Sequence, residues 1–167
     1  MADVQRAISV SALLTPELVL PELRARTKIE VLEALGAHVG LVQPTVDVGH
    51  LVQCLHEREQ QSTTALENGV AIPHVRVAGL AAPFATFARS TEGVDYGASD
   101  GNPTRLFLLL IVAAEQPGGH LKLLARAARV LSDAGCRSRL LDAASGSELL
   151  DVLREHEQRV HAGLRAA

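Results

Sequence analysis

Leu106-Phe107-Leu108-Leu109-Leu110-Ile111-Val112 is a run of seven apolar residues from which the fold class can be predicted. Every position is apolar, so a strand over these residues buries both of its faces, as a central strand does when helices cover each side of a sheet. Extended to Ala114, the run is about half the length that a membrane-spanning helix needs. We therefore expect the middle strand of an α/β sheet here, and no direct insertion into a membrane.

Two more strands are expected upstream of this run. Gly69–Ile72 forms a short apolar segment that ends at Pro73, which has no N–H to donate to a sheet. Pro83–Arg89 has the pattern of a further strand, and residues 92–103 are dense in turn-forming residues. His74 follows Pro73 directly and is therefore expected on a loop at the end of a strand.

The N-terminal part of the chain is expected to form two helices. Thr27-Lys28-Ile29-Glu30 has the pattern of a capping box, and Gly40 is the expected stop of the helix that it opens. A second helix is expected to begin near Thr45 or Asp47 and to run into Glu57-Arg58-Glu59. Arg58 would thus lie where that helix gives way to a loop.

Helical periodicity returns after Gln116-Pro117-Gly118-Gly119, so His120 is expected in the first turn of a helix. The apolar positions predicted to face inward are Leu121, Leu124, Ala128 and Leu131. A short helical piece, Arg137 to Ala143, and a last helix that begins near Ser145 or Ser147 complete the expected elements. Beyond Glu155 the polar end is expected to fray.

Length and composition favour one domain. The 167 residues are 47% hydrophobic but only 2% aromatic with no Trp, so the core must consist of Leu, Val, Ile and Ala. The net charge is -3 and the basic residues are spread along the chain, so no nucleic acid partner is expected. Cys54 and Cys136 lack a CxxC or zinc-type spacing, which fits a reduced, cytoplasmic protein without a structural metal.

These observations predict a single α/β domain in which a mixed β-sheet is flanked by helices on both faces. We expect the domain over residues 13–155, an N-terminal segment over residues 1–12 and a polar C-terminal tail over residues 156–167.

Histidine is the obvious candidate for chemistry, because its neutral imidazole is a competent nucleophile near neutral pH. Five of the seven histidines lie in helices or in the polar C-terminal stretch and are expected to face solvent: His38, His50, His56, His156 and His161. His50 and Cys54 lie four residues apart and could share a metal, but no further ligand has a recognisable spacing.

Three residues gain significance together. His74 would present an imidazole at the end of a strand, His120 would lie beside the free N–H groups of a helix start, and Arg58 offers a guanidinium that matches phosphoryl oxygens. Each alone has a structural reading, as a strand cap, a helix cap or a solvated arginine. Converging on one point, they are suited to hold a phosphoryl group.

One segment of the sequence resembles the active-site segment of a known family. It consists of Arg58-Glu59, followed by Thr63-Thr64-Ala65-Leu66-Glu67-Asn68-Gly69-Val70-Ala71-Ile72-Pro73-His74. The family is the fructose, mannitol and nitrogen-regulatory enzyme IIA family of the phosphotransferase system. The resemblance covers Leu13 to Glu155 and includes, in the same order, Asp100-Gly101-Asn102-Pro103-Thr104-Arg105-Leu106 and the helix start at His120-Leu121. It implies the mannitol and fructose type of enzyme IIA architecture.

The resemblance also implies the roles of individual residues. His74 would be the phosphorylated residue, His120 the second active-site histidine and Arg58 the arginine that faces the phosphate. The sequence departs from the family at Ala65 and Glu67, where glycines are common, and at Val75, where Gly or Ala is usual. A stiffer loop, a bulkier rim and a negative charge near the site are therefore expected.

By this resemblance, His74 takes a phosphoryl group from the histidine-containing phosphocarrier protein. It then passes the group to an enzyme IIB, or its phosphorylation state controls binding to a regulatory target protein. No metal or organic cofactor is needed, because the donor is already activated. The alternatives are a binding module of the same fold that is not phosphorylated and, less favoured, a hydrolase with His74 as general base, for which no Gly-x-Ser-x-Gly signal is present.

Overall fold

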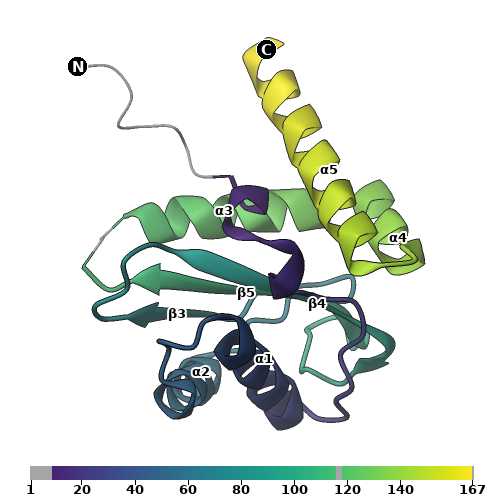
Figure 1. Ribbon diagram of the computed structural model, residues 1–167. Helices are drawn as coiled ribbons and strands as arrows, with labels where there is room; N and C mark the ends of the chain where they lie inside the picture. Colours follow the sequence, from purple (N-terminus) through teal and green to yellow (C-terminus); the bar gives the residue numbers. More distant parts are fainter. Residues whose placement is uncertain (1–8, 116–117, 167) are drawn as a thin grey trace, which may run out of the picture.

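A mixed β-sheet forms the centre of the molecule. The computed structural model describes residues 9–115 and 118–166 (Figure 1), and within them the sheet has five strands in the order β1-β4-β5-β2, with β3 also paired to β5. β4 and β5 run antiparallel, whereas all the other pairs are parallel. The strands are β1 (Val19–Leu20), β2 (Val70–Ala71), β3 (His74–Val77), β4 (Phe84–Val94) and β5 (Thr104–Ala113).

Helices cover both faces of this sheet, as predicted. Figure 1 shows α1 (Lys28–Val42) and α2 (Val48–Gln61) below it, and α3 (Gly119–Ser132), α4 (Ala134–Asp142) and α5 (Gly146–Ala166) above it. Two short 3₁₀ turns, Ser11–Leu13 and Pro16–Leu18, lead into β1. Within the described ranges, no helix is both long enough and apolar enough to cross a membrane.

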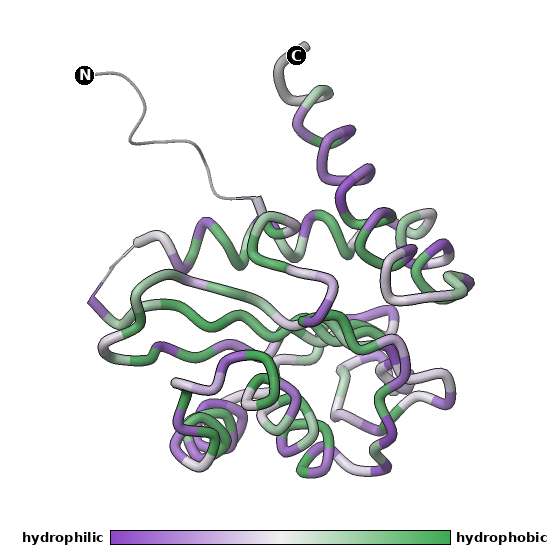
Figure 2. The backbone as a smooth tube through the Cα atoms, viewed as in Figure 1, coloured by the Kyte–Doolittle hydropathy of each residue, from purple (hydrophilic) through white to green (hydrophobic). Residues whose placement is uncertain are grey.

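β5 is the central strand that its composition predicts. The side chains from Leu106 to Ile111 are at most 1% exposed, and β4 flanks them on one side while β2 and β3 flank them on the other. Figure 2 shows this strand in the colour of apolar residues, between helices in which hydrophilic and hydrophobic residues alternate. Burial on both faces explains why the strand has no polar alternation.

The N-cap of α1 is formed by Thr27, whose Oγ1 accepts from the N–H of Glu30 at 3.2 Å, as the capping box predicts. The predicted stop at Gly40 is wrong, since α1 continues to Val42. Both helical glycines instead allow close packing of α2, because a Cβ at Gly36 or Gly40 would lie 2.4 or 2.3 Å from a valine methyl carbon of that helix.

β2 and β3 form one interrupted strand along the edge of β5. Asn68 and Gly69 adopt left-handed conformations (φ 65° and 76°), which turn the chain back so that it enters β2. Pro73 lies in the break, yet its carbonyl accepts from the N–H of Leu110 at 2.9 Å, so the chain continues along β5. His74 is therefore the first residue of β3, and its predicted place on a loop is wrong.

Two other predicted boundaries shift. β4 runs to Val94, so the turn-rich loop begins later than residue 92. In α3 the buried residues are Leu123, Ala127, Val130 and Leu131, whereas Leu121 is 69% exposed, so its predicted inward position is wrong. Of the predicted turn before α3, Gln116 and Pro117 lie outside the described residues, and Gly118 is the N-cap (φ 92°).

The C-terminal stretch does not fray after Glu155, because α5 continues to Ala166. Glu157 is only 3% exposed, and its carboxylate accepts from the N–H of Val10 at 2.7 Å and from both the N–H and the Oγ of Ser11, at 3.0 and 2.7 Å. The helix is thereby tied to the beginning of the described chain.

Candidate active site

A pocket of about 320 Å³ opens where the edge strand β3 meets the end of α2 and the start of α3. It contains Arg58, His74 and His120, which are far apart in sequence. The structure thus brings the three sequence-predicted site residues together. The full lining consists of Cys54, Glu57, Arg58, Gln61, His74, Val75, Arg76 and His120.

His74 has both ring nitrogens engaged. Nδ1 lies 2.8 Å from the carbonyl oxygen of Ile72, which can only accept, so Nδ1 carries the proton and donates. Nε2 then has its lone pair free to accept, and it accepts from Arg58 Nε at 3.1 Å. The neighbouring groups therefore select the tautomer in which Nδ1 carries the proton and Nε2 has the lone pair.

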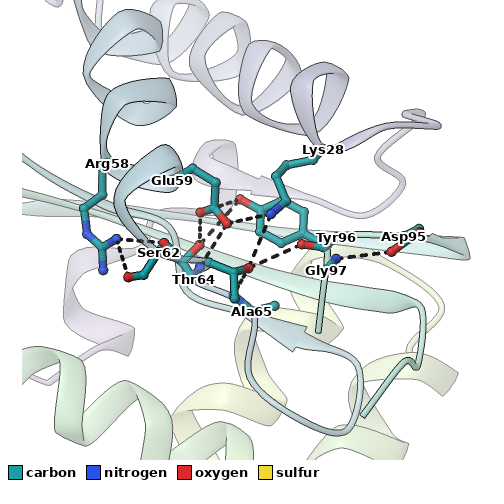
Figure 3. A network of polar contacts seen from close by, with 10 residues as sticks. Lys28, Arg58, Glu59, Ser62, Thr64, Ala65, Asp95, Tyr96 and Gly97 are labelled. Carbon is teal, nitrogen blue, oxygen red and sulfur yellow. Dashed lines mark hydrogen bonds and ion pairs between the residues drawn. The ribbon is translucent and has the colours of Figure 1, made fainter. Parts of the chain in front are cut away.

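Arg58 reaches the imidazole from the last turn of α2. Besides the bond from its Nε to His74, one terminal nitrogen donates to the carbonyl oxygen of Ser62 at 3.0 Å, and Figure 3 shows this side chain folded toward Ser62. Ser62 is the C-cap of α2, so the guanidinium is held by the end of its own helix.

His120 lies in the first turn of α3, and its ring centre is 5.0 Å from that of His74 at an interplanar angle of 51°. Its Nδ1 is buried and has no hydrogen-bond partner among the described residues. Burial lowers the pKa of His120 below its ordinary value, and the positive charges of Arg76 and Arg58 act in the same direction, as a proton on His74 would. His120 lines the pocket at the head of α3, and a ring at a helix start is suited to bind an external anionic group.

The pKa of His74 also lies below its ordinary value. Burial is the largest cause, the bond to the Ile72 carbonyl opposes it, and the charge of Arg58 reinforces it. His74 is consequently neutral at pH 7, which is the state that a nucleophile requires.

Sequence reasoning missed Arg76, which lies two residues beyond His74 in β3. Side chains two apart in a strand share a face, so this spacing was a usable signal for a second arginine at the site. Val75 lines the pocket, as expected of a bulkier rim. Glu67 does not, because the turn at Asn68 carries it to the other end of β2, and the acidic residue in the lining is Glu57.

Glu59, next to Arg58, is a buried residue with no predicted role. It is 8% exposed and joins a polar network that Figure 3 shows behind the end of α2. Its carboxylate accepts from Lys28 Nζ at 3.0 Å, from Thr64 N and Oγ1 at 3.0 and 2.5 Å and from the Tyr96 hydroxyl at 3.3 Å. Burial raises the pKa of Glu59, but the bonds from Thr64 and Lys28 outweigh burial and leave it below its ordinary value.

The remaining histidines lie outside this pocket. His50 lies 3.6 Å from Cys54 through Nε2, and His38 lies 2.8 Å from the carbonyl oxygen of Glu17. His156 is not solvent-facing as expected, since its side chain is 12% exposed and lies 4.0 Å from Asp133. In the part of the chain that the structure describes, no group of three or more His, Cys, Asp or Glu residues is arranged to hold a metal.

Comparison with known proteins shows relatives over most of the chain. A nitrogen regulatory protein of Bradyrhizobium diazoefficiens is 33% identical over 144 residues, which are 86% of this chain and 94% of that protein. The fructose-specific EIIA component of Haloferax volcanii is 35% identical over 126 residues, 72% of this chain and 82% of that protein. The fructose-specific EIIABC component of Bacillus subtilis is 27% identical over 151 residues. The match covers 90% of this chain but only 24% of that protein.

Solved structures agree with these relatives. The nitrogen regulatory protein IIA-Ntr of Neisseria meningitidis matches with a TM-score of 0.80 at 28% identity, over 86% of this chain and 98% of that one. The Escherichia coli mannitol enzyme IIA, in its complex with phosphorylated enzyme IIB, shares the fold with a TM-score of 0.69 at 21% identity, over 85% of this chain and 97% of that one.

The predicted resemblance is confirmed at the level of the family. Residues 12–156 match the family described as "Phosphoenolpyruvate-dependent sugar phosphotransferase system, EIIA 2". With the sheet, the flanking helices and the motif around His74 in place, the chain belongs to the type 2 enzyme IIA family of the phosphotransferase system.

Proposed function

We propose that this protein is a phosphoryl carrier whose His74 accepts the group on Nε2 from the histidine-containing phosphocarrier protein. The observation that carries the proposal is the pair of bonds on the ring: Nδ1 donates to Ile72 and Nε2 accepts from Arg58 at the pocket. The nitrogen with the free lone pair is thus the one beside a cation and an open volume.

The transfer requires little covalent work from the protein. The donor's P–N bond breaks, its ring nitrogen leaves with the electron pair, and a bond forms between phosphorus and His74 Nε2 while Nδ1 keeps its proton. Arg58 Nε exchanges Nε2 for a phosphoryl oxygen, and His120 and Arg76 lie in the same pocket to bind the others. A metal or organic cofactor has no step to perform, because the phosphoramidate donor is already activated.

Two destinations of the phosphoryl group follow from the relatives. The nitrogen regulatory relatives support a role in which phosphorylation controls binding to a regulatory target protein. The complex of a protein with this fold and phosphorylated enzyme IIB supports relay to an enzyme IIB. Both roles support a cytoplasmic location for the protein, and its two free cysteines, Cys54 and Cys136, fit a reducing compartment.

Phosphorylation itself is tested by incubation with phosphoenolpyruvate, enzyme I and the phosphocarrier protein. We expect an acid-labile mass gain of one phosphoryl group, located on Nε2 by ³¹P and ¹⁵N NMR, and no gain for His74→Ala. His50→Ala, which removes an exposed histidine from α2, is the matched control and should be labelled like the wild type. An unlabelled wild-type protein would favour the binding-module alternative, and labelling of His74→Ala would move the site elsewhere.

A further inference from the structure

Glu59 is buried, charged and has no part in the transfer as described so far. Desolvation of a carboxylate is costly unless hydrogen bonds replace the water, and Glu59 receives four of them. Two of the four come from Thr64, through its N–H and its hydroxyl, and the other two come from Lys28 and Tyr96. Glu59 therefore fixes the backbone and the side chain of Thr64 at once, just after the end of α2 (Figure 3).

Thr64 in turn holds Ile72. The N–H of Ile72 donates to the carbonyl oxygen of Thr64 at 3.0 Å, across the hairpin turned by Asn68 and Gly69. The carbonyl oxygen of Ile72 is the group that accepts from His74 Nδ1 at 2.8 Å. A continuous path of hydrogen bonds thus runs from the Glu59 carboxylate through Thr64 and Ile72 to the imidazole.

The last turn of α2 therefore acts on both nitrogens of His74. Arg58 contacts Nε2 directly, and its neighbour Glu59 reaches Nδ1 through Thr64 and Ile72. A backbone carbonyl that turned away from the ring would leave the Nδ1 proton without a partner, and the tautomer with the proton on Nε2 would gain population. That tautomer has no lone pair at the nitrogen that faces Arg58.

We propose that Glu59 and Thr64 are positioning residues: they hold the Ile72 carbonyl against His74 Nδ1 and thereby keep Nε2 as the nucleophile. Neither residue touches the phosphoryl group. The effect on transfer rests on the proposed function of His74, whereas the effect on the tautomer exists in the unphosphorylated protein. The two can therefore be tested separately.

The test uses Thr64→Val, which keeps the side-chain shape and the backbone N–H but removes the hydroxyl donor, together with Glu59→Gln, which removes the charge. Thr64→Ser restores the hydroxyl. The matched control is Thr86→Val, because Thr86 is also buried and its hydroxyl has no partner among the described residues. Long-range ¹H–¹⁵N spectra of the unphosphorylated proteins report the His74 tautomer, and labelling by the phosphocarrier protein gives the rate and the phosphorylated nitrogen.

We expect the proton on Nδ1 in the wild type, Thr64→Ser and Thr86→Val. Thr64→Val and Glu59→Gln should show mixed tautomers, transfer slower by about tenfold or more, and some label on Nδ1. A wild-type tautomer in a folded Thr64→Val protein would overturn the proposal, even if transfer were slow. If Glu59→Gln does not fold, the comparison of Thr64→Val with Thr64→Ser decides the positioning role alone. If the wild-type protein is not labelled, the proposed function is wrong, but the His74 tautomer in the variants still tests the positioning role.

Discussion

At the scale of single residues, the chemistry depends on the charge state of one ring. Burial and the Arg58 guanidinium both lower the pKa of His74, so the folded protein resists protonation of the ring that we propose as the nucleophile. The bond from Arg58 Nε to Nε2 acts in the same sense, because a protonated Nε2 could not accept it.

The pH dependence follows from the lowered pKa values of His74 and His120. Labelling should stay constant down to the ordinary histidine pKa of about 6.5 and decline only below it. Just below a pH of about 6.5, His74 and His120 bind protons in the unfolded chain but stay neutral in the folded protein. The free energy of unfolding should therefore also fall as the pH decreases from about 6.5 to the pKa values of the folded protein. NMR titration of both rings and urea unfolding at several pH values check this, and a His74 pKa above the ordinary value would contradict it.

His120→Ala should slow transfer about 10²-fold, which is the effect of losing one positioned donor at a reacting group. Its Nδ1 is buried and unpartnered among the described residues, so the fold loses no internal hydrogen bond from that atom. Single-turnover labelling measures the rate, and far-UV circular dichroism verifies the fold. An unchanged rate in both directions would leave His120 with a structural role only.

At the scale of elements, the position of α2 determines where Arg58 lies. Two glycines of α1 allow α2 to approach closely, and a methyl group at Gly36 would lie 2.4 Å from Val52 Cγ2. Such overpacking displaces one helix from the other.

Gly36→Ala should lower the free energy of unfolding by about 1–3 kcal/mol and should slow labelling of His74. Val52→Ala in the same chain should restore part of both losses, since it removes the clashing methyl groups. Gly49→Ala is the control, because its Cβ would meet only Asp47 Oδ1 at an ordinary 3.5 Å. Urea unfolding of the wild type, Gly36→Ala, Val52→Ala and the double variant gives the coupling free energy, with Gly49→Ala measured beside them. Additive effects of Gly36→Ala and Val52→Ala would argue against a direct clash.

The elements themselves could largely be predicted from sequence, because periodicity and caps are local signals. The wrong predictions have tertiary causes. Gly40 has the appearance of a helix stop, but its missing side chain serves contact with Val48. Pro73 has the appearance of a strand end, but its carbonyl still bonds to Leu110. In α3, periodicity alone did not reveal that Leu121 faces away from the sheet.

At the scale of the whole molecule, α5 joins the two ends of the described chain. Glu157, in the middle of this helix, is buried, and its partners are Val10 and Ser11. An acceptor-only carboxylate suits these three donors, whereas an amide would direct N–H groups at one of them.

Glu157→Gln should therefore destabilise the protein by about 1–3 kcal/mol through an unsatisfied buried donor. Glu157 lies in α5, whereas the pocket is formed by α2, β3 and α3, so labelling of His74 should not change. Glu155→Gln, at an exposed carboxylate of the same helix, is the control. Urea unfolding measures the loss, and equal stability of the two variants would contradict the anchoring role.

The site could be predicted only in part, because some of its contacts form only when distant parts of the chain fold together. His74 and Arg58 lie within one motif, and His120 follows from the order of elements in the family. Arg76 could have been found from the two-residue spacing in β3, once His74 was recognised as part of a strand. The role of Glu59 has no local signal, because it arises only when Thr64 folds back onto its carboxylate. Local patterns identify nucleophiles more readily than the groups that hold them.

The bond between Arg58 Nε and His74 Nε2 has a consequence for chemical selectivity. In the resting protein the reactive lone pair is covered, so small electrophiles, such as acylating reagents or low-molecular-weight activated phosphates, meet no free nitrogen there. A docked protein donor differs, because its phosphoryl oxygens attract the guanidinium and uncover the nitrogen in the same movement. If His74 carries the phosphoryl group as proposed, the arginine that assists the donor also protects the histidine from modification by small reactive molecules.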